Sequence, residues 1–169
     1  YKIIEFLHVK PGKGPAFVRT KLKSVSSGKV IDNTFTAGHK IDDVRVENRK
    51  YQYLYNDGET FHFMNTEDFN QIEVNESIIE GRKFLKEGTV VTIIINTENS
   101  NILSVEIPQS VILEIISSDP GVKGNTATNA TKIAVLETGV EINVPLFIDE
   151  GDKVKVDTEK GNYLERIKD

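Results

Sequence analysis

The residue with the clearest chemical potential is a single lysine between two Gly/Pro pairs. In the stretch HVKPGKGPAFVRTKL, Lys13 follows Pro11-Gly12 and precedes Gly14-Pro15. Proline fixes φ and glycine permits turn conformations that other residues avoid, so a stiff, narrow loop is predicted. A solvated lysine is a poor general base, and Lys13 is better suited to covalent modification or to phosphate contact. An ordinary hairpin turn has the same composition, and this stretch alone favours that simpler interpretation.

Alternating aromatic residues form a second candidate site. Tyr51, Tyr53 and Tyr55 alternate along one expected strand, and Phe61 and Phe63 along its expected partner. Such rings could stack on nucleic acid bases. Cross-strand packing in a core is the more common use of this pattern, and it is the favoured interpretation here.

Three acidic pairs are the remaining candidates for catalytic groups. Neighbours on a strand point to opposite faces, and all three pairs lie beside polar or turn residues, so solvated surface is predicted for Asp42-Asp43, Glu67-Asp68 and Asp149-Glu150. The sequence also contains no nucleophile elbow, P-loop or dinucleotide fingerprint. It therefore makes no positive case for an enzyme, and no catalytic residue is expected.

The composition excludes several other kinds of site. The chain has no cysteine, which excludes disulfides and thiolate chemistry, and His8, His39 and His62 are scattered, so no metal or cofactor is expected. No apolar run approaches the roughly 18 residues that span a bilayer, and the N-terminus shows no signal-peptide pattern. These features predict a soluble, cytoplasmic protein without a membrane partner.

The net charge of −5 conceals a polarised chain. Residues 1–43 carry eight Lys/Arg against four Asp/Glu, whereas residues 44–169 carry thirteen against twenty-two. A basic end could be drawn toward phosphate while the acidic remainder limits indiscriminate binding to nucleic acid. An unevenly charged, solvated surface would have the same composition.

Short runs of period-two alternation between turn residues predict an all-β protein. Residues 1–9 and 16–22 are the arms of a predicted opening hairpin, and Asn56-Asp57-Gly58 marks the turn of another. One short helix is predicted over 77–88, because Ile78, Ile79, Arg82 and Leu85 have roughly helical spacing and Gly88 can end it. The segment 117–131 is predicted to be an exposed loop within the last unit.

The strand spacing suits three small β units, and it favours Greek-key barrels of the oligonucleotide-binding type. One boundary is predicted near Asp43, where the charge balance changes, and another near Ile107-Pro108, where a proline interrupts the strand pattern. The predicted domains are therefore 1–43, 44–107 and 108–169.

Several stretches together resemble the bacterial elongation factor P family. HVKPGKGPAFVRTKL is similar to the tip loop of that family, KIAVLETGVEINVPLFIDEG to the signature of its last domain, and GNYLERIK to its C-terminus. Further likeness in residues 51–55 and in DPGVKGNTAT extends the resemblance over essentially the whole chain. The spaced match in the last domain makes the resemblance specific, and it favours a functional role for Lys13.

The resemblance implies an L-shaped, tRNA-like protein with a KOW-like (SH3-like) domain followed by two OB-fold barrels. Family members bind the ribosome, its rRNA and proteins, between the peptidyl and exit sites beside the peptidyl-tRNA, and they relieve stalling at consecutive prolines. By this likeness Lys13 is extended by a lysine-modifying enzyme and reaches the peptidyl-transferase centre, within a tip loop that comprises Lys10, Pro11, Gly12, Gly14 and Pro15. A monomer is expected.

The resemblance also implies candidate RNA or tRNA contacts outside the tip loop, namely Arg19, Lys21, Gly124, Asn125, Thr126, Tyr163 and Arg166. The family often has Gly-Asp-Thr where this chain has Gly124-Asn125-Thr126, and asparagine lacks the charge of aspartate. Tyr163 has an alternative role in packing against the last strand. By the same likeness about twenty residues are expected to precede Tyr1.

Two other functions are weighed against a translation factor. A generic single-stranded RNA-binding barrel protein would depend on the aromatic strands and not on Lys13. An enzyme would need one of the acidic pairs to form a site, and no site geometry is suggested for any of them.

Overall fold

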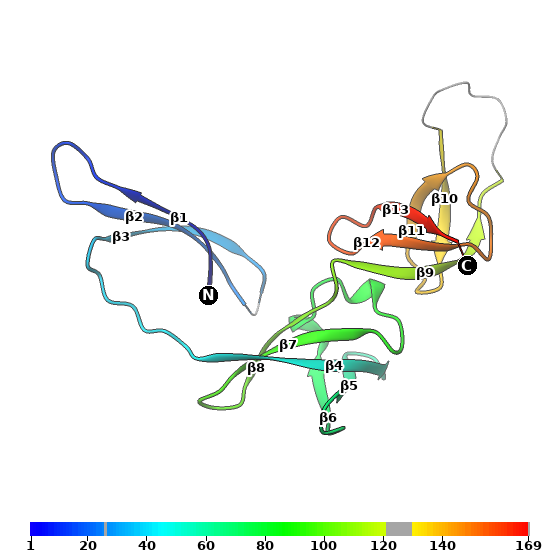
Figure 1. Ribbon diagram of the computed structural model, residues 1–169, viewed down its shortest axis with the longest axis horizontal. Coiled ribbons are helices and arrows are strands. Elements are labelled where there is room, and N and C mark those ends of the chain that lie inside the picture. The colour runs from blue at the N-terminus through cyan, green and yellow to red at the C-terminus, as the bar shows by residue number, and fades with distance from the viewer. Residues whose placement is uncertain (26, 121–129, 169) are drawn as a thin grey trace.

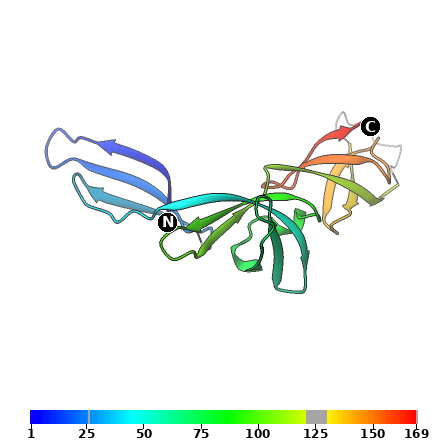
Figure 2. The ribbon, with the colours of Figure 1, turned by 60° about the horizontal axis from the view of Figure 1, so that its bottom comes forward.

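The computed structural model describes residues 1–25, 27–120 and 130–168, and its regular structure consists of strands and two short 3-10 helices (Figure 1). Strands form three antiparallel sheets that follow one another along the chain. Figures 1 and 2 show the first and last sheets on opposite sides of the central one, in a bent row. The predicted all-β class of three small β units is confirmed.

The first sheet has the strand order β1-β2-β3, with β1 at Lys2–Val9, β2 at Phe17–Lys23 and β3 at Val30–Thr36. The predicted opening hairpin is confirmed, since Val9 pairs with Phe17 next to the loop. This sheet has little core of its own: among its described residues only Thr20 is buried, and Phe6 is 72% exposed. Hydrogen bonds between strands, more than apolar burial, hold it together in this chain.

The central sheet has the order β6-β5-β4-β7-β8 and curls around an apolar core. Its strands are β4 (Val46–Asn56), β5 (Thr60–Asn65), β6 (Gln71–Asn75), β7 (Val90–Asn96) and β8 (Ile102–Glu106). The predicted turn at Asn56-Asp57-Gly58 is confirmed, and Gly58 adopts a φ of 109°, which suits glycine.

The C-terminal sheet has the order β11-β10-β9-β12-β13 and encloses a second core. Its strands are β9 (Ser110–Ser118), β10 (Thr131–Leu136), β11 (Glu141–Pro145), β12 (Lys153–Asp157) and β13 (Tyr163–Ile167). The predicted loop over 117–131 is shorter than expected, because strand residues occupy both ends of that range. Residues 121–129 lie outside the described part.

The predicted helix over 77–88 is wrong. Two 3-10 turns stand there instead, η1 at Glu76–Ile78 and η2 at Arg82–Phe84, separated by Gly81 with a φ of 74°. The physical reason is that the apolar residues do not share one buried face: Ile79 belongs to the central core, whereas Phe84 belongs to the C-terminal core. On an α-helix two residues five positions apart point about 140° away from each other, and the left-handed φ of Gly81 interrupts a right-handed helix between them.

Candidate functional site

The loop between β1 and β2 carries Lys13 at the end of an extended arm. The arm is the β1–β2 hairpin, whose loop lies far from the other two sheets in Figure 1. Gly14 has a φ of 108°, a conformation that favours glycine, and the nearest atom to an added Cβ there would be Cγ of Pro11 at 4.0 Å. The sequence therefore forms the narrow turn that Gly and Pro predict.

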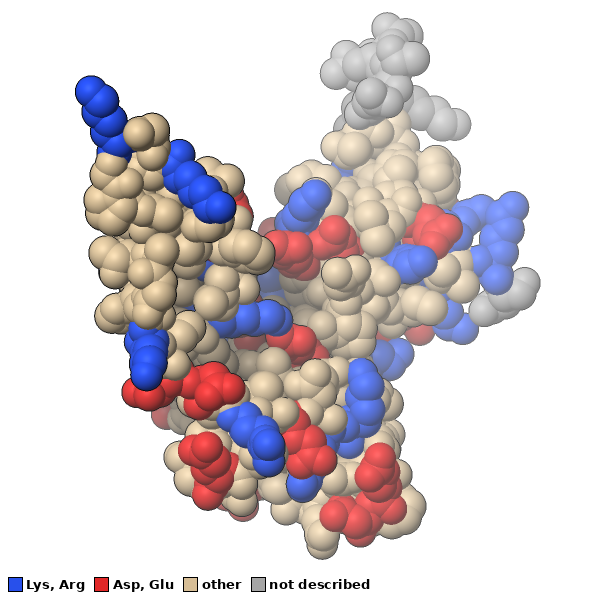
Figure 3. All heavy atoms as spheres, turned by 60° about the vertical axis from the view of Figure 1, so that its left-hand side comes forward, with Lys and Arg blue, Asp and Glu red and all other residues tan. Residues whose placement is uncertain are grey.

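The Lys13 side chain is exposed, and it makes no hydrogen bond or ion pair with any residue that the structure describes. Lys10 and Pro15 of the same loop are also exposed, while Pro11 is half-buried. In Figure 3 the arm with its Lys and Arg side chains stands apart from the rest of the molecule. A free amine on such an arm can enter a narrow site on a partner, or be modified, without disturbing the fold.

Two further basic side chains lie on β2, below the tip loop. Arg19 is exposed and lies over the ring of Phe17, with 5.5 Å between its Cζ and the ring centroid. Lys21 Nζ is 2.8 Å from Glu5 Oε2 across the hairpin. This hydrogen bond, with the charge of Glu5, raises the pKa of Lys21. Lys21 would have to leave Glu5 before contacting phosphate, whereas Arg19 has no such partner among the described residues.

The candidate residues of the C-terminal sheet lie far from the tip loop. Tyr163 is the first residue of the last strand, β13, and its side chain packs against the C-terminal core. Arg166 Nη1 is 3.6 Å from Asp152 Oδ2, and its Cζ is 5.7 Å from the ring centroid of Phe147. Arg166 also lines a surface cavity of about 310 Å³, together with Asp152, Lys153 and Lys168. Gly124, Asn125 and Thr126 fall outside the described residues.

The candidate aromatic platform is mostly core. Tyr51, Tyr53, Phe61 and Phe63 are each at most 7% exposed, which confirms the favoured packing interpretation. Burial, together with the charge of Glu87, raises the pKa of Tyr53. Buried rings cannot stack on bases, so the structure does not support a generic single-stranded RNA-binding surface built from these strands. Tyr55 is the exception, at 52% exposed.

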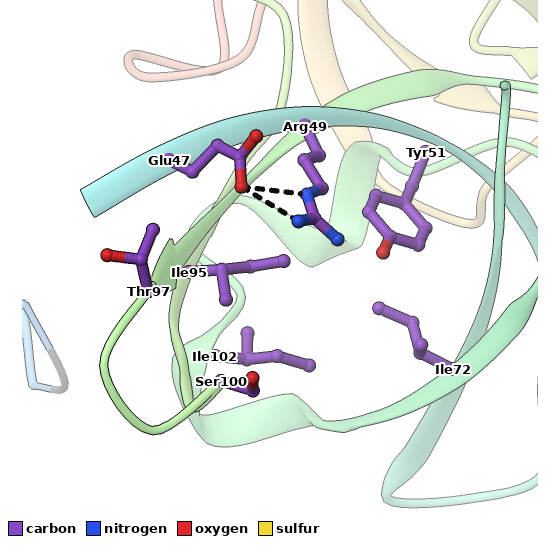
Figure 4. A pocket seen from close by; sticks show the side chains of 8 residues that line it. All are labelled: Glu47, Arg49, Tyr51, Ile72, Ile95, Thr97, Ser100 and Ile102. Atoms are coloured by element: carbon purple, nitrogen blue, oxygen red, sulfur yellow. Dashed lines mark hydrogen bonds and ion pairs between the residues drawn. The ribbon is translucent and has the colours of Figure 1, made fainter. Parts of the chain in front are cut away.

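A cavity of about 250 Å³ lies at one end of the central sheet (Figure 4). Arg49 donates from Nε and Nη2 to Oε2 of Glu47, at 3.1 and 2.7 Å, at the rim of this cavity. The hydrogen bond to Glu47 and the negative charge of its carboxylate raise the pKa of Arg49. The remaining lining residues are Tyr51, Ile72, Ile95, Thr97, Ser100 and Ile102. Because the guanidinium is already paired, the cavity offers no free charge to a ligand.

The acidic pairs are exposed at both positions, which confirms their predicted place on the solvated surface. Asp149 is paired with the buried Lys132 at 3.3 Å. Within the described residues, no group of three or more His, Asp or Glu side chains has the arrangement of a metal site. Nor does that part of the chain contain a helix long and apolar enough to span a membrane.

Family models cover the chain in three consecutive segments. Residues 1–41 match the elongation factor P (EF-P) KOW-like domain, 46–105 match the EF-P OB domain, and 111–166 match the elongation factor P C-terminal model. The chain belongs to the elongation factor P family. It is therefore related to translation factors, and the resemblance seen in its sequence is confirmed.

Curated relatives of this family match the chain over almost its whole length. Elongation factor P of Christiangramia forsetii is 66% identical over 100% of this chain and 90% of its own length. The protein of the same name from Moorella thermoacetica is 50% identical over 98% of this chain and 89% of its own. Among solved structures, the eukaryotic translation initiation factor 5A from Methanococcus jannaschii is 24% identical, with a TM-score of 0.45, over 62% of this chain and 79% of its own.

Proposed function

We propose that this chain is a non-enzymatic translation factor that binds the ribosome between the peptidyl and exit sites and stimulates peptide-bond formation at consecutive prolines. The observation that carries the proposal is the exposed, unpaired Lys13 at the end of a narrow arm, in a chain that matches the elongation factor P family over three successive segments. The factor acts as a monomer in the cytoplasm, where its partners are rRNA, ribosomal proteins and peptidyl-tRNA.

The proposed role of Lys13 is to hold the end of the peptidyl-tRNA. Proline is a poor partner in peptide-bond formation because its ring restricts the geometry of attack, so fixing a reactive pose lowers the entropic part of the barrier. A modifying enzyme that extends the Lys13 side chain would lengthen its reach. No acid, base or nucleophile is required from the factor, because the ribosome supplies the reaction centre.

The other candidate contacts are secondary in this proposal. Arg19 and Lys21 approach RNA phosphates near the acceptor end, and Gly124, Asn125, Thr126, Tyr163 and Arg166 approach RNA from the C-terminal unit. The basic first domain enters among phosphates, while the acidic units limit non-specific RNA binding. The domain boundaries at 43/44 and 107/108 stay predictions.

The experiment that tests the proposal is peptide yield in a reconstituted bacterial translation system, on a message with three consecutive prolines. The full-length, natively purified protein should restore yield, and Lys13→Ala should lose most of that rescue. Lys29→Ala is the matched control, since Lys29 is an exposed lysine of the same unit that lies directly before β3 and outside the tip loop. It should act as the wild type does.

The mass of the tryptic peptide that contains Lys13 completes the test, because it reveals whether a group is attached. Equal yield with wild-type protein, with Lys13→Ala and with no factor would overturn the proposal for natively purified protein. Equal loss of rescue in Lys13→Ala and Lys29→Ala would show that general basic charge, and not the tip lysine, is responsible.

A further inference from the structure

We propose that a row of side chains on the outer face of the central sheet binds an arginine side chain of a basic protein partner. The row, called here the aromatic row, comprises Tyr55 on β4, His62 on β5 and Glu73 on β6, together with Asp57 in the β4–β5 turn. It lies in a different sheet from Lys13, and the proposal does not rest on the function proposed above.

Strand register brings the row together. Tyr55 pairs with His62, and His62 pairs with Glu73, so the three side chains stand side by side on one face across three strands. A β-bulge between Tyr53 and Tyr55 makes this possible. Without the extra residue, Tyr55 would follow the alternation of Tyr51 and Tyr53 into the core; with it, the ring turns outward.

The two rings of the row are stacked and anchored. The ring centroids of Tyr55 and His62 are 4.4 Å apart, and the planes differ by 19°. His62 Nε2 is 3.2 Å from Asp57 Oδ2, which fixes the imidazole beneath the phenol ring. The His62 side chain is 12% exposed, while Tyr55 is 52% exposed. The His62 ring is therefore a largely covered support, and the Tyr55 ring is open to the outside.

The stretch of chain that carries the aromatic row is acidic, although Arg82 pairs with its Glu76 and Lys23 with its Glu80. Residues 51–81 contain no Lys or Arg, and they contain seven acidic residues: Asp57, Glu59, Glu67, Asp68, Glu73, Glu76 and Glu80. Glu73, at the end of the row, has no ion-pair partner within the described part of the chain. Carboxylates beside an open ring favour a cation and repel a phosphate backbone.

An arginine side chain fits an open ring beside carboxylates better than a lysine side chain or a nucleotide base does. Its planar guanidinium stacks on an aromatic face while its N–H groups donate to neighbouring carboxylates, which are here Asp57 and Glu73. Lysine could satisfy the charge but not the stacking plane. A nucleotide base could stack on Tyr55, but its phosphate would approach the carboxylates of Asp57 and Glu73, neither of which is paired with a Lys or Arg of the described residues.

The test is an NMR titration of the full chain with a short peptide that alternates arginine and glycine. The backbone amide signals of Tyr55, His62 and Glu73 should shift on binding. Tyr55→Ala should raise the dissociation constant roughly two- to fivefold, as expected for the loss of an exposed cation–π contact. Tyr55→Phe should retain binding, because it keeps the aromatic ring. Glu73→Gln should weaken binding at low salt and have less effect at high salt.

Phe69→Ala is the matched control, because Phe69 is an exposed aromatic residue of the same acidic stretch that makes no ring stack among the described residues. It should bind the peptide as the wild type does. Unchanged affinity in Tyr55→Ala would overturn the proposal, as would equal weakening in Phe69→Ala. A glycine-lysine peptide of equal length that binds equally well would reject arginine, and tighter binding of a single-stranded RNA oligonucleotide at the same residues would replace the protein partner with RNA.

Discussion

The two junctions between the three sheets are built from different interactions. Exposed ion pairs bridge the first sheet to the central one: Lys23 Nζ lies 2.8 Å from Glu80 Oε2, and Lys2 Nζ lies 3.5 Å from Glu106 Oε1. A buried ring bridges the central and C-terminal units. Phe84 follows the central sheet's β6 in sequence but is fully buried in the C-terminal core.

Several other contacts reinforce the second junction. Ile107 packs against both cores, Thr158 Oγ1 donates to the carbonyl oxygen of Pro108 at 2.6 Å, and Lys86 Nζ is 2.9 Å from Glu137 Oε1. Burying a phenylalanine side chain contributes about 1.5–3 kcal/mol, whereas an exposed ion pair contributes about 0–1 kcal/mol and weakens with salt. We therefore expect the central and C-terminal units to behave as one body, and the arm with Lys13 to be held more weakly.

The largest effect is expected from removing the ring that joins the two cores. Phe84→Ala should lower the free energy of unfolding of the C-terminal unit by about 3–5 kcal/mol, because a filled position becomes a cavity. Chemical denaturation followed by a probe in the C-terminal unit measures this. Phe147→Ala, at a position 60% exposed, is the control and should change stability by at most about 1 kcal/mol, the size of an exposed cation–π contact such as the one with Arg166. Equal changes in both variants would contradict the proposed difference between the junctions.

A smaller loss is expected from crowding the same junction at Gly81. An alanine Cβ there would lie 2.6 Å from Cδ1 of Ile107, and the φ of 74° is itself unfavourable for alanine. Gly81→Ala should therefore lower the free energy of unfolding by about 2–4 kcal/mol, because it combines backbone strain with overpacking. Gly139→Ala isolates the backbone term, since Gly139 has a φ of 81° and no atom within 4 Å of the added Cβ. If both variants unfold at the same denaturant concentration, the contact with Ile107 adds nothing to the backbone strain. Ile107 would then be free to move aside, and the expected overpacking would be contradicted.

The smallest effect is expected at the first junction. A double-mutant cycle of Lys23→Ala and Glu80→Ala should give a coupling free energy below about 1 kcal/mol, and that coupling should largely disappear at about 1 M salt. The cycle is measured by thermal or chemical unfolding at two salt concentrations. A coupling well above 1 kcal/mol that persists in high salt would show that the first sheet is held as firmly as the C-terminal one.

Local features of the fold were predictable from the sequence. The hairpins around Lys13 and around Asp57 follow from period-two alternation and from turn residues whose φ angles are restricted or unusually free. The solvated acidic pairs followed from the same alternation. These features depend on neighbours within a few residues, so a single sequence is sufficient to find them.

The two 3-10 turns that replace the predicted helix, and the aromatic row, could not be predicted from the sequence in this way. Residues 77–88 have helical spacing, but Phe84 and Ile79 are buried in different cores, and spacing alone does not say how many cores there are. The alternation of Tyr51, Tyr53 and Tyr55 likewise implies one shared face, and the bulge that separates Tyr55 leaves no clear sequence signal.

The sequence by itself determined the strand pattern, the position of the Lys13 turn and the family to which the chain belongs, because each depends on residue types at fixed spacing. Only the tertiary structure decided which side chains share a core and which aromatic ring stays exposed. The physical reason is that burial depends on strand register and on contacts between segments far apart in sequence. Phe84 and Tyr55 owe their environments to such contacts, and neither environment can be derived from the residues beside them.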